Sequence, residues 1–150
     1  MKFRSIFSFV LFGLMLASWQ VQSHCWKEAE LKYRIDAKLL KSIAIVESGM
    51  NPYAFNKNRD GSFDLGLMQI NNKNFGLLRE KGIEPMDLVN NPCQSVMAGA
   101  LILTIMIRKF GYNWQAVGAY NAGLKEGLEN DRRRMKYAAK VWGIYKQPNI

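Results

Sequence analysis

The stretch that decides the fold is residues 47–71, which read ESGMNPYAFNKNRDGSFDLGLMQIN. Upstream of it, Asp36 is placed to cap a helix that begins at Ala37, and Gly49 is placed to end that helix. Within it, Asp60-Gly61 is the strongest short hairpin signal in the chain. The stretch therefore predicts a helix end followed by a small β-hairpin or turn region.

Glu47 is the residue that does not fit the pattern of this helix. The apolar stripe runs through Leu40, Ile43 and Ala44, and the next position on the same face is Glu47. Burial of a carboxyl group raises its pKa, and a glutamic acid that stays protonated near neutral pH is suited to general-acid catalysis. The alternative is a structural glutamate satisfied by backbone N–H groups or a lysine, and the helix pattern alone does not separate the two.

The rest of the chain is predicted to be mainly helical. An apolar run from Val96 to Ile107, interrupted only by Thr104, predicts a helix buried at the centre of the domain, and Asn91-Pro92 marks its start. The fold class is therefore mainly α, of the α+β kind. Further helices are predicted over residues 25–34, 72–81, 114–122 and 132–145.

Size, composition and charge limit the classes of protein to which the chain can belong. The chain has 150 residues, of which 49% are apolar, and a formal net charge of +9. This length fits one compact domain, and this composition excludes a disordered chain. The charge favours an anionic partner such as nucleic acid, a membrane surface or an acidic polymer. His24 is the only histidine, so neither a metal nor a cofactor is expected.

Residues 1–23 are interpreted as a cleaved secretory signal peptide. A positively charged start precedes an apolar run over residues 6–17 and a small-residue cleavage site that ends at Ser23. The alternative is an uncleaved membrane anchor, but the run is shorter than the about 20 residues that span a bilayer. We therefore expect an exported domain of residues 24–150 without a stable membrane anchor, and export argues against a nucleic-acid partner.

Export also decides how the cysteines are interpreted. Cys25 and Cys93 are the only two, and an oxidising compartment favours a disulfide between them. The bridge would join the start of the mature chain to the start of the predicted central helix. Chain-entropy arguments assign such a closure about 4 kcal/mol of stabilisation.

Three motifs in order resemble those of the Slt-type lytic transglycosylases of the lysozyme-like superfamily. They are ESxxNP at residues 47–52, GLMQIN at residues 66–71 and AYNAG at residues 119–123. The motifs and their surroundings span about residues 25–145. The resemblance is in particular to the small periplasmic enzymes that accompany type III and type IV secretion systems and pili. It implies a lysozyme-like fold with a substrate cleft, and a periplasmic location.

The same stretch also resembles c-type lysozymes. Their pattern NxDGSxDxGxxQIN is met from Asn58 to Asn71, and Asp64 follows Glu47 by 17 positions, as the second lysozyme carboxylate does. Most Slt-type relatives lack this second acid. The chain therefore combines transglycosylase motifs with a lysozyme-like aspartate, and the alternative for Asp64 is a turn or capping role.

The resemblance implies a substrate and a site. The substrate is the β-1,4 bond between N-acetylmuramic acid and N-acetylglucosamine in the glycan strands of peptidoglycan. Glu47 would act as acid and then as base to form a 1,6-anhydro product, while Asp64 would stabilise positive charge on the sugar. Tyr137 matches the late tyrosine that contacts the catalytic glutamate, although Tyr120 and Tyr137 would also suit the core. The residues implied to bind substrate are Ser48, Gln69, Asn71, Tyr120, Asn121 and Tyr137.

Two other functions stay open at this point. A muramidase would hydrolyse the same bond, with Asp64 positioning water or attacking the sugar. A non-catalytic wall-binding assembly factor would keep only the fold. In each case we expect a monomer that acts where a periplasmic protein component of a secretion system or pilus places it.

The densest run of charge is Arg132-Arg133-Arg134, which is predicted to open the last helix. A cationic cluster at that position opposes the helix dipole. A solvated face is the favoured interpretation, and attraction to the anionic cell wall is the alternative.

Overall fold

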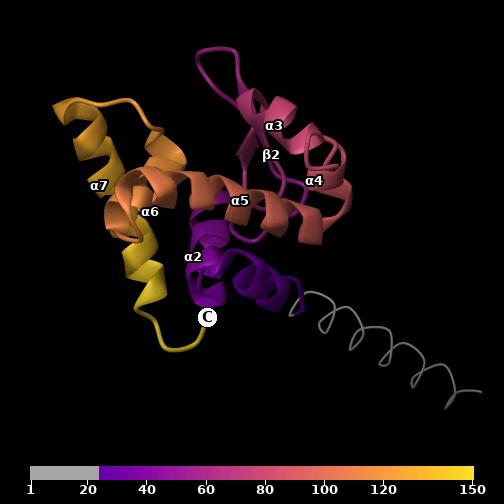
Figure 1. Cartoon of the computed structure of the whole chain (residues 1–150), viewed down its shortest axis with the longest axis horizontal. Helices are drawn as coiled ribbons and strands as arrows, with labels where there is room; N and C mark the ends of the chain where they lie inside the picture. The colour runs from indigo at the N-terminus through magenta and orange to yellow at the C-terminus, as the bar shows by residue number, and fades with distance from the viewer. Residues whose placement is uncertain (1–23) are drawn as a thin grey trace, which may run out of the picture.

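A computed structural model of the chain describes residues 24–150 as a mainly helical domain with one small sheet (Figure 1). This confirms the predicted fold class. The predicted signal peptide, residues 1–23, lies outside the described residues. Residues 24–33 are helical, and the α-helices that follow are α2 (Ala37–Ser48), α3 (Phe75–Arg79), α4 (Asp87–Asn90), α5 (Pro92–Phe110), α6 (Trp114–Ala122) and α7 (Leu128–Tyr145).

The helix α2 begins and ends where the sequence predicts. The Asp36 carboxylate accepts a hydrogen bond from the Lys38 N–H at 2.8 Å, which satisfies one of the free donors of the first turn. Gly49 takes the left-handed conformation with φ of 61°; its N–H donates to the Ile45 carbonyl, and the N–H of Met50 donates to the Ala44 carbonyl. The helix buries its apolar stripe and brings Glu47 to its last turn.

The predicted hairpin forms the first two strands of a three-stranded antiparallel sheet. Its strands are β1 (Phe55–Lys57), β2 (Phe63–Leu65) and β3 (Ile70–Asn71), in the order β1-β2-β3. The turn between β1 and β2 holds Asp60, whose carboxylate accepts from the Ser62 N–H at 3.1 Å. In the register of the sheet, Asp64 faces Asn71 across β2 and β3. A 3₁₀ helix (Asn72–Asn74) and α3 then replace the single helix predicted over residues 72–81.

The central helix is α5, as predicted from its apolar run. Asn91 caps it by accepting hydrogen bonds from the N–H groups of Cys93 and Gln94, with Pro92 in the first turn. By length and composition it would also pass for a membrane span, but half of that stretch is buried within the domain. It contacts α2, α4, α6 and β3, so we treat it as the core helix on which the other elements pack (Figure 1).

The last helix differs from its prediction. It begins at Leu128, and its first turn carries Glu129 and Asp131, which suit the positive end of the helix dipole. The arginine run therefore lies in the second turn and does not open the helix. Arg134 faces the core and is 1% exposed; its guanidinium donates to the Lys125 carbonyl at 2.9 and 3.0 Å. The solvated face predicted for the run is wrong for Arg134, while Arg132 and Arg133 are exposed.

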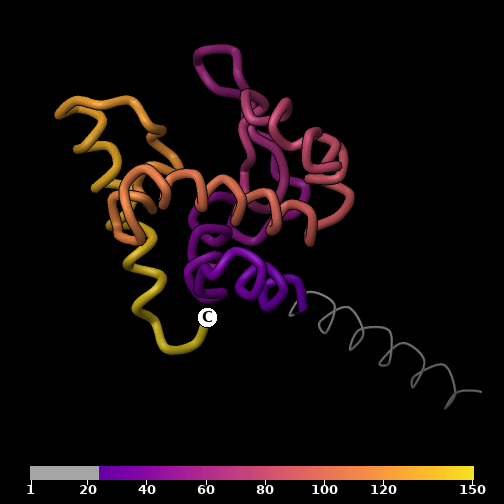
Figure 2. The backbone as a smooth tube through the Cα atoms, viewed as in Figure 1, coloured from indigo at the N-terminus to yellow at the C-terminus, as the bar shows by residue number. Residues whose placement is uncertain are grey.

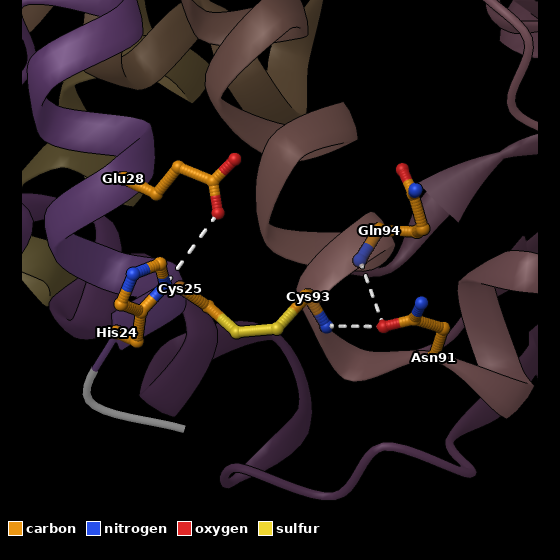
Figure 3. The surroundings of a disulfide bond; sticks show 6 residues. All are labelled: His24, Cys25, Glu28, Asn91, Cys93 and Gln94. Atoms are coloured by element: carbon orange, nitrogen blue, oxygen red, sulfur yellow. Dashed lines mark hydrogen bonds and ion pairs between the residues drawn. A yellow bond between two sulfur atoms is a disulfide. The ribbon is translucent and has the colours of Figure 1, made fainter. Parts of the chain in front are cut away.

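A disulfide joins Cys25 to Cys93, with their Cα atoms 5.2 Å apart and a sequence separation of 68. Figure 3 shows the bridge between the N-terminal helix and the first turn of α5, beside the Asn91 cap. An ion pair between His24 and Glu28, 3.7 Å apart, lies at the same end of the N-terminal helix. The predicted pairing is present in the structure.

Candidate active site

A cleft with a volume of about 680 Å³ lies between the sheet and α6. One wall comes from the β1–β2 hairpin, β3 and the 3₁₀ helix, and the other comes from the end of α6. Figure 2 shows the hairpin and the α6–α7 connection projecting to the same side of α5. The lining residues that the sequence had marked as candidates are Glu47, Asp64, Gln69, Asn71, Tyr120 and Asn121.

Glu47 combines burial with a position at the cleft. The pKa of its carboxyl group is raised from 4.5 to about 7, chiefly by burial and in smaller part by the negative charge of Asp64. A hydrogen bond from Tyr137 and the positive charge of Lys140 act in the opposite direction. Near neutral pH the group is therefore divided between acid and carboxylate, which suits a residue that gives and then takes a proton.

Tyr137 holds the Glu47 carboxyl group from α7. Its hydroxyl donates to Glu47 Oε1 at 2.5 Å, and its side chain is 5% exposed. Burial and the nearby Glu47 carboxyl raise the pKa of the Tyr137 hydroxyl well above its usual value, so it stays a donor. The structure thus shows the contact with Glu47 that the family resemblance implied for this tyrosine.

Asp64 is held in the cleft by side-chain amides. Its Oδ1 accepts from Asn71 Nδ2 at 2.7 Å, and its Oδ2 accepts from Asn58 Nδ2 at 2.9 Å. Ser62 ties the two amides together, because its hydroxyl accepts from both Asn58 and Asn71 at 3.1 Å. The arrangement fixes a negative charge within electrostatic range of Glu47.

Three predicted binding residues have defined places. Gln69 lies at the tight turn before β3, with φ of 48°, and its amide donates to the carbonyls of Ala54 and Gly66 at 3.1 and 2.9 Å. Tyr120 lines the cleft, and its hydroxyl donates to the Met68 carbonyl at 2.8 Å. Both side chains therefore brace the cleft wall. Asn121 lines the same wall.

Ser48 is placed differently from the other predicted binding residues. It does not line the cleft, and its hydroxyl donates to the carbonyls of Leu67 and Ala44 at 2.7 and 3.2 Å. The bond to Leu67 joins the last turn of α2 to the loop before β3. Ser48 therefore fixes the position of its neighbour Glu47 relative to the sheet.

Some cleft residues were not assigned by sequence reasoning. Ile102 and Met106 form the apolar part of the cleft from α5, because the central helix lies at the bottom of the groove. Asn58 is the first residue of the lysozyme-like pattern that also contains Asp64. Its position in this pattern was the signal from which its hydrogen bond to Asp64 could have been predicted. Arg133 also lines the cleft, and no feature of the arginine run distinguished it from its neighbours. Among the described residues, no group of three His, Cys, Asp or Glu side chains is arranged to hold a metal ion.

The fold and the site define a class of protein. A partly buried glutamic acid at the end of a helix, an aspartate on a small antiparallel sheet and a cleft between them are the features of a lysozyme-like domain. Residues 24–142 match the family Transglycosylase SLT domain, and the chain belongs to this family.

Curated relatives cover most of the chain. The "Invasion protein IagB" of Salmonella typhimurium (strain SL1344) is 47% identical over 123 residues, which is 82% of this chain and 76% of the relative. The "Protein IpgF" of Shigella flexneri is 41% identical over 124 residues, or 83% of this chain and 80% of the relative. The "Peptidoglycan-binding-like protein" of Escherichia coli O157:H7 is 38% identical over 157 residues, covering 99% of this chain and 90% of the relative.

Proposed function

We propose that the chain is an exported peptidoglycan lytic transglycosylase that cleaves the β-1,4 bond between N-acetylmuramic acid and N-acetylglucosamine and leaves a 1,6-anhydro end. The observation that carries the proposal is the partly buried Glu47 carboxyl group, with a pKa of about 7, at a cleft of about 680 Å³, a volume in the usual range of ligand sites. Membership of the Transglycosylase SLT domain family supports the reaction class. The name of the Escherichia coli relative, "Peptidoglycan-binding-like protein", agrees with the substrate.

The reaction uses one carboxyl group twice. Protonated Glu47 gives its proton to the glycosidic oxygen, the bond to C1 of the muramyl sugar breaks, and the sugar becomes oxocarbenium-like. The Asp64 carboxylate stabilises this positive charge across the cleft. Glu47, now ionised, accepts the proton of the C6 hydroxyl as the C6 oxygen bonds to C1. Tyr137 stabilises the ionised intermediate state of Glu47 by its hydrogen bond.

The test is the product formed from purified cell wall. We expect mass spectrometry of the released muropeptides to show anhydro ends, which are lighter than hydrolysed ends by one water. Glu47→Gln keeps the size of the side chain but cannot transfer a proton, so it should reduce release by at least about 100-fold. Wall lysis that continues unchanged in Glu47→Gln would disprove the assignment of Glu47.

A second candidate function is hydrolysis of the same bond, and the observation that favours it is the geometry of Asp64. An aspartate held by two amides is suited to orient water or to attack the sugar. The hydrolase would release reducing ends in place of anhydro ends. Asp64→Asn should abolish activity if the aspartate is the nucleophile. If the aspartate only stabilises charge, the variant should keep anhydro products at a reduced rate.

The resemblance and the names of the relatives support a proposal for the cellular role. We propose that the enzyme acts in the periplasm and opens the wall locally for a secretion system or pilus, in keeping with relatives that carry the name "Invasion protein". The non-catalytic assembly factor is the competing role. We expect weak wall lysis by the purified enzyme and stimulation by a periplasmic component of the apparatus. If the purified enzyme digests sacculi rapidly and the added component does not change the rate, the proposed dependence on a periplasmic partner is contradicted.

A further inference from the structure

A second pocket, of about 330 Å³, lies between the end of α2 and α7 and opens beside the catalytic cleft. Glu47, Asn121 and Arg133 line both the pocket and the cleft, so the two spaces are continuous. The residues that line only the second pocket are Val46, Lys136, Tyr137 and Lys140. We call this space the α7 pocket.

The α7 pocket is strongly basic. Arg133, Lys136 and Lys140 are spaced by three and four residues, so they follow one face of the helix. All three side chains are exposed. The only acidic residue in the lining is Glu47, which is about half neutral at pH 7 because its pKa is about 7. Three positive charges therefore surround at most one negative charge.

Two of these cations have no side-chain partner, in contrast to the paired cations of the surface. Lys73, Arg79 and Lys109 each form an ion pair with a neighbouring acid. Within residues 24–150, neither Arg133 nor Lys136 has a hydrogen bond or an ion pair to another side chain. Like charges that gather without acids repel one another, and an anionic ligand would relieve the repulsion.

We propose that the α7 pocket binds the free carboxylates of the short peptides attached to the muramyl residues of peptidoglycan. This inference rests on the proposed function, because it names a second part of the same substrate. The peptide is attached to the muramyl sugar whose bond Glu47 would cleave, and the α7 pocket is the basic space that adjoins Glu47. Exposed charge pairs contribute modestly to binding, so the site adds selectivity for peptide-bearing strands.

The experiment compares two forms of one substrate. Soluble wall fragments are used as such or after their carboxylates have been converted to amides with carbodiimide and ammonia, which removes charge and keeps the sugars. The pocket variant is Arg133→Gln/Lys136→Gln. The matched control is Arg132→Gln/Lys146→Gln, which removes the same charge from exposed positions of the α7 region that do not line the pocket.

We expect the wild type to prefer the free-carboxylate form by about three- to tenfold in kcat/KM, mainly through KM, because exposed ion pairs contribute about this much. The pocket variant should lose this preference, and the control should keep it. Equal losses of preference in the two double variants would show general attraction to the wall and overturn the proposal. So would a wild type that cleaves both forms equally well, which would leave the charges free for an acidic protein partner.

Two further measurements separate the possible failures. A wild type that releases no anhydro or reducing ends from either form would contradict the proposed function itself, whereas a loss of preference alone concerns only the α7 pocket. Should Arg133→Gln/Lys136→Gln unfold below the wild-type temperature, the single variant Lys136→Gln is compared with Arg132→Gln in the same two substrates. Lys136→Gln is expected to lose more of the preference for free carboxylates than Arg132→Gln does. Equal preferences in these two single variants would again overturn the proposal.

Discussion

At the residue scale, the chemistry depends on the balance of influences on one carboxyl group. Burial and the charge of Asp64 raise the pKa of Glu47, while the Tyr137 hydroxyl and Lys140 lower it, and the result is about 7. A group with this pKa is an acid of useful strength and, once ionised, a base of useful strength. Each of the neighbours therefore has a predictable effect on the pH dependence of the reaction.

The first prediction concerns that pH dependence. If cleavage requires protonated Glu47, kcat/KM should be level below about pH 7 and should fall about tenfold per pH unit above it. The measurement is the rate of release of soluble wall fragments between pH 5 and pH 9. A rate that stays constant up to pH 9 would show that Glu47 does not supply the proton.

The second prediction concerns stability. The pKa of Glu47 is about 7 in the folded chain against an ordinary value of 4.5, so the unfolded state loses its proton first. The folded state is thus destabilised as the pH rises from 4.5 through 7, by up to about 3 kcal/mol. Glu47→Gln should be more stable than the wild type at pH 8, and the difference should be smaller at pH 5. Urea unfolding at the two pH values measures it, with Glu80→Gln as the exposed control.

The third prediction concerns Tyr137. In Tyr137→Phe, Glu47 loses the hydrogen bond that lowers its pKa, so the alkaline fall in rate should move to higher pH. Tyr120→Phe is the comparison, because the Tyr120 hydroxyl donates to the Met68 carbonyl. A shift of equal size in both variants would mean that the change comes from cleft packing. The readout is the midpoint of the alkaline limb of kcat/KM.

The residues of the site differ in how well the sequence predicts their roles. Glu47 was recognisable because it takes an apolar position of α2, and Asp64 because of its place in a motif. The hydrogen bond of Ser48 to the Leu67 carbonyl could not be predicted, since it depends on how the loop before β3 packs against α2. Arg133 was also missed, because its role depends on the register of α7 and on the cleft that this helix borders.

At the scale of elements, the position of Tyr137 depends on how closely α7 packs on α6. Gly118 in α6 lies against the backbone of Arg134, and a Cβ atom added there would come within 2.3 Å of the Arg134 carbonyl oxygen. The arginine side chain is buried over the Phe110 ring, with its guanidinium carbon 4.7 Å from the ring centroid. This close approach depends on how the two helices pack, which periodicity within the last helix could not reveal.

The fourth prediction tests this packing. Gly118→Ala should destabilise the fold by about 1–3 kcal/mol, because the two helices must separate to admit the methyl group. Gly143→Ala in α7 is the matched control; a Cβ atom there would have no neighbour within 4 Å. It should stabilise the helix by about 0.5–1 kcal/mol. Chemical denaturation measures both, and equal effects of the two variants would contradict the close approach.

At the scale of the whole molecule, the cleft is assembled from segments that are distant in the chain. The Glu47 carboxyl group comes from α2, the Asp64 charge near it from the sheet, and the Tyr137 hydroxyl that donates to it from α7. The motifs made these segments recognisable one by one; α2 was predicted from its Asp36 cap, whereas the last helix was predicted to begin at residue 132 and begins at Leu128. The continuity of the cleft with the α7 pocket could not be predicted, since it arises only where α2 and α7 meet.

The last prediction concerns the covalent link across the fold. The Cys25–Cys93 bridge closes a loop with a sequence separation of 68 and ties the N-terminal helix, which buries Trp26 and Ala29, to the start of α5 (Figure 3). Such a closure restricts the unfolded chain and contributes about 4 kcal/mol. Cys25→Ala/Cys93→Ala should lose about this much stability in urea, and dithiothreitol should weaken the wild type to a similar degree.

The double variant supplies its own control, because it has no disulfide to reduce and should be insensitive to dithiothreitol. The bridge is remote from the cleft lining, so the variant should cleave wall fragments at the wild-type rate at temperatures where it remains folded. A wild type whose unfolding midpoint is the same with and without the reductant would contradict the contribution of the bridge. A loss of activity in the folded variant would instead show that the N-terminal helix helps to set the position of α2 and Glu47.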